Sequence, residues 1–131
     1  MPAPEQVALE APLDAAFAPA LRLIVGGIAE RADFGFEAMD DLQLAIERLL
    51  VEAGHEGRVR LTFELREDGI RVWIGPLREA GMADALQHPE RAPGTLTLRR
   101  ILTTVVDSFG VEPLDGGDVI VRLDKLVARP A

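Results

Sequence analysis

Apolar residues recur at helical spacing in two neighbouring stretches of the first half of the chain. In residues 14–31 they predict a helix that Asp14 caps and that admits Pro19 near its first turn. The stripe expected to face the core consists of Phe17, Leu21, Ile24, Val25 and Ile28. Gly26 and Gly27 interrupt this helix at a cost in stability, so we expect a neighbouring element to pack closely there.

The second stretch, residues 35–54, has the clearest helical pattern in the sequence. Gly35 stands at its start, and Gly54 stands where a helix C-terminus favours glycine. Its expected buried face consists of Met39, Leu42, Ile46, Leu49, Leu50 and Ala53. The helix dipole favours the carboxylates near its N-terminus, so we interpret them as an ordinary helix start rather than a binding surface: Glu37, Asp40 and Asp41.

Alternating apolar and polar residues predict the strands. Residues 5–13 alternate weakly and indicate an edge strand, whereas residues 58–65 alternate strictly. The turn at residues 66–69 ends in Asp-Gly, so residues 70–74 are expected to return as the partner strand. A second hairpin is expected near the C-terminus, with strands at residues 111–113 and 118–123.

Between the two hairpins the periodicity is lost and then returns as a helix. Residues 75–93 predict a mobile loop, with one short helical turn around residues 82–86. Residues 94–109 predict a third helix with Gly110 as its C-terminal cap. The element order predicts an α+β fold, a two-layer α/β sandwich with helices on one face of a mostly antiparallel sheet.

Length and charge narrow this interpretation. The 131 residues suffice for a single domain, residues 1–131, with an ordered core at about residues 5–126. A net charge of −8 disfavours binding to nucleic acid, so we expect a protein partner. Lys125 is the only lysine, which suggests a GC-rich bacterial genome.

Targeting signals and metal ligands are not expected. The N-terminus lacks the pattern of a signal peptide, and no apolar run reaches the roughly 20 residues that cross a bilayer, so we expect a cytoplasmic protein with no membrane partner. The chain has no cysteine, and its two histidines, His55 and His88, lie far apart in the sequence. Neither a thiolate nor a histidine metal site is therefore expected.

Three segments carry a resemblance to a known family. They are RLIVGGIAERADFGFEAMDDLQLAIERLL at residues 22–50, REDGIRVWI at residues 66–74 and ILTTVVDSFGVE at residues 101–112. They resemble the bacterial anti-sigma factor serine kinases, which belong to the GHKL ATPase superfamily with the histidine-kinase-like ATPase domains. The similarity runs from about Leu21 to Leu126. It implies the Bergerat-type ATPase fold and a homodimer.

The residues that process ATP in that family are not matched here. Its second helix presents a Glu that acts as general base or orients a water and, four residues on, an Asn that holds magnesium. The matching positions are Arg48 and Glu52. An arginine cannot accept a proton at neutral pH, whereas a carboxylate can bind Mg²⁺. The spacing of Arg48 and Glu52 also allows them to form an ion pair with each other.

The two glycine motifs of the family are altered as well. Its Asp-x-Gly-x-Gly motif, which contacts adenine, corresponds to residues 76–80, which begin at Pro76, include Arg78 and contain neither Asp nor Gly. Its Gly-x-Gly-Leu phosphate motif corresponds to residues 94–98, where only Gly94 is kept and Thr95 follows it. Gly94 and Thr95 still permit an anion-binding helix start, but a plain helix start is the simpler interpretation.

Two function hypotheses follow from this resemblance. The first is a non-catalytic, anti-sigma-factor-like regulator that binds a sigma factor or an anti-sigma antagonist, uses no cofactor and keeps a vestigial pocket formed by Glu52, Pro76, Arg78, Gly94 and Thr95. The second is a divergent serine/threonine protein kinase that uses ATP with Mg²⁺, with Glu52 at the metal and Glu47 or Glu79 as base. We favour the first, because the metal, base and phosphate motifs are altered together.

Two further expectations concern single side chains. Trp73 lies in a predicted strand and becomes a candidate for partner binding if it points away from the helical layer, since exposed aromatic residues mark interfaces. The cleft that lacks nucleotide motifs is expected to be filled by the chain's own side chains, such as Leu77 or Met82.

Overall fold

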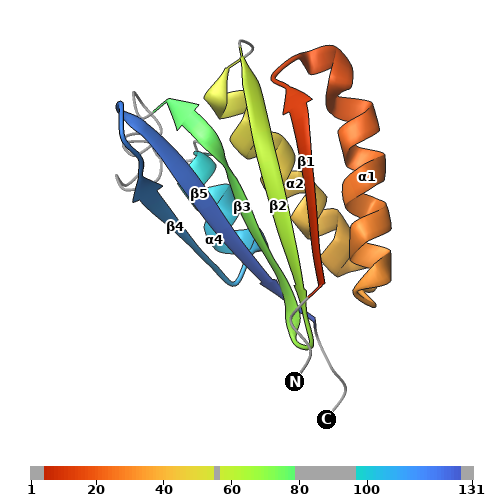
Figure 1. The fold of residues 1–131 in the computed structure, drawn as a ribbon. Helices are drawn as coiled ribbons and strands as arrows, with labels where there is room; N and C mark the ends of the chain where they lie inside the picture. Colours follow the sequence, from red (N-terminus) through yellow and green to blue (C-terminus); the bar gives the residue numbers. More distant parts are fainter. Residues whose placement is uncertain (1–4, 55–56, 79–96, 128–131) are drawn as a thin grey trace.

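Five antiparallel strands form one sheet, and the helices pack against a single face of it (Figure 1). The computed structural model describes residues 5–54, 57–78 and 97–127. The strand order across the sheet is β1-β2-β3-β5-β4. In chain order the elements are β1 (Glu5–Pro12), η1 (Ala15–Phe17), α1 (Ala18–Arg31), α2 (Phe36–Ala53), β2 (Arg58–Arg66), β3 (Gly69–Arg78), α4 (Leu98–Val105), β4 (Ser108–Pro113) and β5 (Asp118–Leu126).

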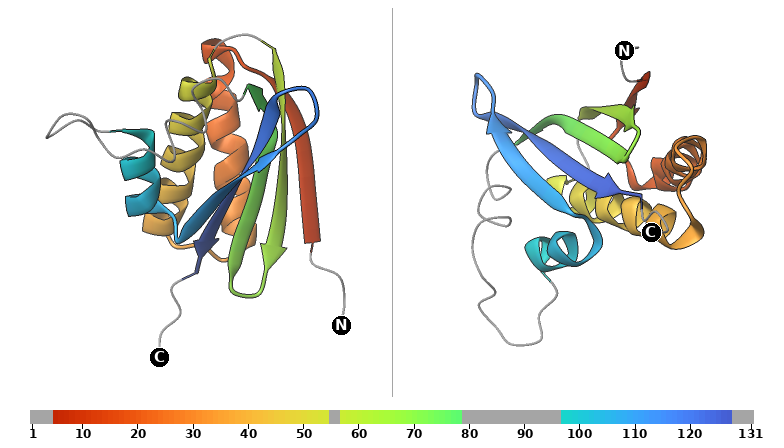
Figure 2. Two further views of the ribbon diagram at one scale, coloured as in Figure 1. Left: turned by 90° about the vertical axis from the view of Figure 1, so that its left-hand side faces the viewer. Right: turned by 90° about the horizontal axis from the view of Figure 1, so that it is seen from below.

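The core lies between this sheet and α2, the central helix. The side chains of Leu42, Ile46 and Leu49 are 0% exposed, as are Leu61 and Phe63 of β2, which face them from the sheet. Each such side chain contributes roughly 1.5–3 kcal/mol relative to an exposed position. The expected two-layer α+β sandwich with helices on one face of an antiparallel sheet is thus confirmed (Figure 2).

Helix α1 begins with a tighter turn than the sequence predicts. Asp14 caps η1, where its Oδ1 accepts a hydrogen bond of 2.9 Å from the Ala16 N–H, and α1 proper starts at Ala18. Leu21, Val25 and Ile28 are buried as predicted. The prediction for Ile24 is wrong: it is 39% exposed, because the residues in contact with the sheet form a narrow stripe and Ile24 lies beside it.

The two adjacent glycines of α1 differ in their surroundings. A Cβ atom added at Gly26 would lie 3.0 Å from Nε2 of Gln43 in α2, so the close packing expected there is confirmed. At Gly27 no atom of the described structure lies within 4 Å of an added Cβ atom, so the expectation is wrong at this position. Only Gly26 faces the neighbouring helix.

Strand β3 is longer than the sequence predicts. The expected loop starts at Gly75, but β3 continues to Arg78, because after a shift in register between Ile74 and Leu77 the strand pairs with β5 again. Pro76 lies within this irregularity, where the absence of an N–H group is tolerated. The remainder of the expected loop, residues 79–93, lies outside the described residues.

The third helix is shorter than predicted, and the strand after it is longer. Thr97 caps α4, the helix ends at Val105, and Phe109 and Gly110 lie in β4 rather than in a helix and its cap. The chain leaves the helix because Val106 is extended and the Asp107 N–H donates a hydrogen bond of 2.9 Å to the Asp124 carbonyl of β5. Pairing with β5 therefore replaces the last helical turns.

The second face of the sheet is not covered by any described helix. Figure 2 shows that α1, α2 and α4 all lie on one side of the sheet. Because side chains alternate between the two faces of a strand, every second strand residue points to the other side. Within the described residues no helix has the length and apolar character that crossing a membrane requires.

Candidate protein interface on the uncovered face of the sheet

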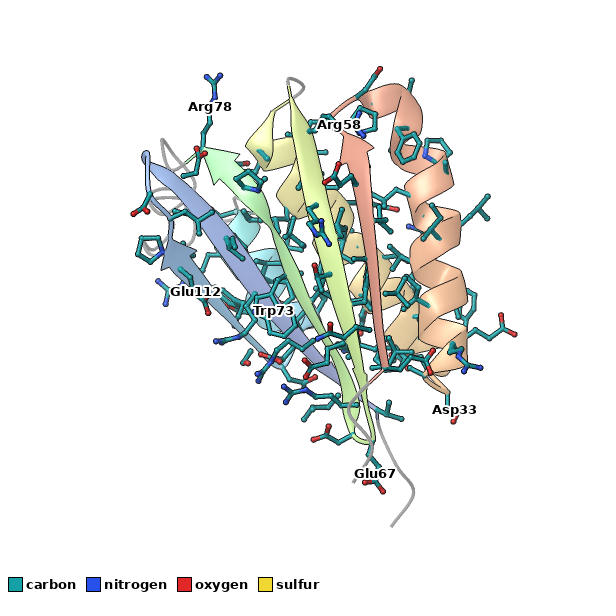
Figure 3. All side chains as sticks on the ribbon, viewed as in Figure 1. Asp33, Arg58, Glu67, Trp73, Arg78 and Glu112 are labelled. Atoms are coloured by element: carbon teal, nitrogen blue, oxygen red, sulfur yellow. The ribbon has the colours of Figure 1, made fainter. Side chains whose placement is uncertain are left out.

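Trp73 points away from the helices. Its neighbours in β3, Val72 and Ile74, are both 0% exposed on the core side, and side chains alternate between the two faces of a strand. Trp73 takes no part in the core formed by the described residues and is half-buried. Figure 3 places it near the middle of the uncovered face. It therefore meets the condition under which the sequence makes it a candidate for partner binding.

A row of small or flat side chains crosses all five strands at Trp73. The pairing registers align Ala8, Thr62, Trp73, Arg122 and Gly110. We call these five residues the Trp73 row. A Cβ atom added at Gly110 would lie 3.1–3.4 Å from the guanidinium of Arg122, so the glycine leaves room for this group to lie flat over β4.

The next row of the sheet is polar and tightly hydrogen-bonded. It aligns Gln6, Glu64, Arg71, Asp124 and Ser108, and we call it the polar row. Asp124 lies at its centre: it accepts hydrogen bonds from Arg71 Nε at 2.6 Å and from Ser108 Oγ at 2.9 Å. Arg122 of the Trp73 row donates to the same carboxylate at 3.0 Å. One carboxylate thus fixes both arginines beside Trp73.

This network shifts the acidity of Asp124. Partial burial raises the pKa of its carboxyl group, but the hydrogen bonds from Arg71 and Ser108 and the charges of Arg71 and Arg122 outweigh burial, so the pKa lies below its ordinary value. The hydrogen bond to Asp124 correspondingly raises the pKa of Arg71. Asp124 is therefore ionised at neutral pH and holds both guanidinium groups in place.

Arg71 also contacts the indole directly. Its Cζ atom lies 5.9 Å from the centroid of the Trp73 ring, within the range of a cation–π interaction. At a partly exposed site this contributes about 0.5–1 kcal/mol and limits the motion of both side chains. The geometry therefore gives an aromatic side chain on a strand that is flanked by two arginines, both oriented by Asp124.

The composition of this face fits a protein partner. Its arginines are largely matched by carboxylates, since Arg71 and Arg122 pair with Asp124 and Arg60 lies 3.7 Å from Glu10. A nucleic-acid surface needs a clear excess of positive charge, which these pairs do not leave. Tryptophan and arginine at the centre of a flat patch are typical of protein interfaces.

The positions matched to the family's base and magnesium residues lie elsewhere, on α2. Arg48 and Glu52 are both exposed. Their spacing places them on the side of α2 that carries Asp41, whose Oδ2 lies 3.1 Å from Lys125 Nζ of β5. The ion pair that this spacing allows is not formed: among the described residues neither side chain has an ion-pair partner. No carboxylate occupies the base position.

The adenine-motif positions lie at the end of β3. Pro76 and Arg78 are exposed, and between them Leu77 is 2% exposed and belongs to the core. Figure 1 shows that the C-terminal ends of β3 and α2 lie at the same end of the molecule, so Glu52, Pro76 and Arg78 share this end. Several residues considered from the sequence lie outside the described residues: His55, Glu79, Met82, His88, Gly94 and Thr95.

The described residues contain no group of three or more His, Asp and Glu side chains that could hold a metal ion. Comparison of the sequence with models of known protein families finds no match, and neither does comparison with curated proteins.

The sequence pattern predicted Trp73 as a candidate for partner binding, but it did not predict which residues surround Trp73. Arg71 and Asp124 are 53 positions apart, and only the strand order β3-β5 brings them together. The alternation of Arg122 and Asp124 with buried residues in β5 marks them as outward-facing, but it does not tell which strand lies beside them.

Proposed function

We propose that this chain is a non-catalytic regulatory protein of the anti-sigma-factor type that acts by binding a protein partner, either a sigma factor or an antagonist of one. The observation that carries the proposal is the position of Trp73, on the uncovered face of the sheet and fixed beside Arg71 and Arg122. A half-buried indole that contributes nothing to the core is best explained by a surface that another protein covers.

The altered motif positions support the non-catalytic part of the proposal. Phosphoryl transfer depends on positioned charge and a metal ion. Arg48 at the base position carries no proton acceptor, and Glu52 at the metal position is exposed. The resemblance to the anti-sigma factor serine kinases supplies the class of partner, and the α+β sandwich agrees with the fold that this resemblance implies.

Affinity for purified sigma factors and their regulators tests the proposal. We expect the wild-type chain to bind one of them, and the Trp73→Thr variant to bind it at least about 30-fold more weakly, which corresponds to roughly 2 kcal/mol for a central aromatic residue. Threonine keeps the β propensity of the strand. Calorimetric titration gives both dissociation constants.

Phe36→Ala is the matched control. Phe36 is 85% exposed at the start of α2, in the helical layer and away from the uncovered face of the sheet, so its removal should leave the affinity unchanged. Equal binding by the wild type and Trp73→Thr, with both folded, would contradict the assigned interface. Failure of every sigma factor and regulator to bind would contradict the assigned class of partner.

A further inference from the structure

A second candidate binding site is a pocket between the end of β1, the start of α1 and the end of α2. The pocket has a volume of about 240 Å³ and opens between the start of α1 and the last turns of α2. Phe17 and Leu21 line it from one side and Leu50 and Val51 from the other, with Leu13 at the end of β1. It lies on the α1 side of α2, whereas Arg48 and Glu52 lie on the side of Asp41.

The walls of this pocket leave apolar surface in contact with water. Val51 at the rim is 54% exposed, and Phe17 and Leu50 are only partly buried, whereas Leu21 is 5% exposed. An apolar group that entered the pocket would gain about 25 cal/mol for each Å² of apolar surface removed from water. The pocket therefore favours an apolar occupant.

The charge of the lining is negative. Among the described residues, Asp14 and Glu47 are the only ionisable residues that line the pocket, and both are acidic. Glu47 pairs with Arg22 at 2.6 Å, but Arg22 also pairs with Asp40 at 2.8 Å, so one positive charge is shared by two carboxylates. Asp14 makes no ion pair among the described residues, and the one hydrogen bond that its carboxylate accepts there comes from a neutral backbone N–H. The rim therefore attracts a cation.

The size of the pocket decides between kinds of occupant. Pockets for drug-sized ligands and cofactors measure about 300–1,000 Å³, so about 240 Å³ suits a side chain rather than a nucleotide. We propose that this pocket is a binding site for an apolar side chain with a lysine or arginine next to it, presented by a partner protein. The site goes beyond the proposed function, because it does not depend on the Trp73 row.

Three blocked dipeptides test this pocket without any knowledge of the partner. We expect acetyl-Phe-Arg-amide to shift the backbone amide resonances of Val51 and Gly54 in the ¹⁵N spectrum of the full chain, with a dissociation constant on the order of 1 mM. Acetyl-Phe-Glu-amide should bind about tenfold more weakly, because its charge is repelled. Acetyl-Ala-Arg-amide should give no saturable shift, because it lacks the apolar side chain.

Two matched substitutions locate the site. Ala18 and Ala20 are both exposed in α1, but only Ala18 lines the pocket, so Ala18→Trp should abolish the shifts and Ala20→Trp should not. If the bulky indole of Ala18→Trp disturbs folding, Val51→Lys at an exposed position of the rim replaces it as the test. The added positive charge should weaken binding of the Phe-Arg peptide and not that of the Phe-Glu peptide. Equal binding of the two Phe peptides to the wild type, or full binding of the Phe-Arg peptide to the folded variants, would overturn the proposal.

Discussion

At the scale of single residues, Asp124 organises the uncovered face of the sheet. It is 14% exposed and receives hydrogen bonds from Arg71, Arg122 and Ser108. Without it the two guanidinium groups would lose their common partner, and the polar groups that flank Trp73 would no longer be oriented. The rigidity of the proposed interface therefore depends on one carboxylate and on its ionisation.

The pH dependence of stability tests this role. The pKa of Asp124 is lowered in the folded protein, so below its ordinary value of 3.8 the unfolded chain binds more protons than the folded one. The contribution of Asp124 is therefore complete at neutral pH and is lost as the pH falls through its folded-state pKa. We expect Asp124→Asn to lose about 1 kcal/mol of stability at neutral pH, since the pairs are partly exposed to solvent.

Urea denaturation at several pH values measures this difference. The gap in unfolding free energy between the wild type and Asp124→Asn should stay constant from neutral pH to about pH 5 and narrow as the pH falls through 3.8 and below, because only the wild type loses the ionised carboxylate. Glu112→Gln, an exposed position in β4, serves as the control. A gap that does not narrow at low pH would refute the role assigned to Asp124.

At the scale of elements, the contact between α1 and α2 fixes the helical layer. Gln43 of α2 donates a hydrogen bond of 2.9 Å to the Arg22 carbonyl of α1, and Arg22 pairs with Asp40 and Glu47. Gly26 lies at the close approach of the two helices, whereas Gly27 faces open space. Glycine at position 26 thus allows the two helices to pack closely, whereas glycine at position 27 only lowers the stability of the helix.

Alanine substitutions distinguish these two glycines. Gly27→Ala should stabilise the protein by roughly 0.5–1 kcal/mol, the difference in helix propensity, because no atom of the described residues lies within 4 Å of the new methyl group. Gly26→Ala should gain clearly less or lose stability, because its methyl group would displace Nε2 of Gln43 from its hydrogen bond. Chemical denaturation of both variants measures the difference, and equal effects would show that the two helices do not approach as described.

Local patterns in the sequence predict most elements, and the misplaced ends of β3 and of the third helix have a common cause. Strands β1 and β2, helix α2 and both hairpin turns follow from alternation, helical spacing and glycine positions. Predictions failed where a distant strand decides the outcome: β5 pairs with the residues after Ile74 and draws the residues after Val105 out of the helix. The surroundings of Trp73 were missed for the same reason, since they depend on strand order.

At the scale of the whole molecule, the helical layer and the uncovered sheet face present different chemistry. Arg48, Glu52 and the apolar pocket belong to the helical layer or its edge, and Pro76 and Arg78 lie at the end of β3, whereas Trp73 points to the opposite face. A domain that binds partners through its sheet can therefore lose nucleotide binding without losing its interface. This separation is compatible with the altered motifs at Arg48 and Glu52.

The proposal predicts no response to nucleotide. Millimolar ATP with Mg²⁺ should leave the melting temperature unchanged, whereas a ligand present at ten times its dissociation constant would add about 1.4 kcal/mol, or several degrees for a domain of this size. Thermal shift measurements with and without Mg²⁺ check this. A magnesium-dependent rise that Glu52→Ala abolishes would contradict the non-catalytic account and favour the divergent kinase.

The most direct test of the central claim uses Trp73 as its own probe. The chain contains a single tryptophan, so incorporation of 5-fluorotryptophan gives one ¹⁹F resonance that reports position 73 alone. On addition of an unlabelled sigma factor or regulator that binds the chain, we expect this resonance to shift and to lose its solvent isotope effect, because the partner covers the indole. A resonance that stays unchanged at saturating partner would show that binding occurs elsewhere and would contradict the account.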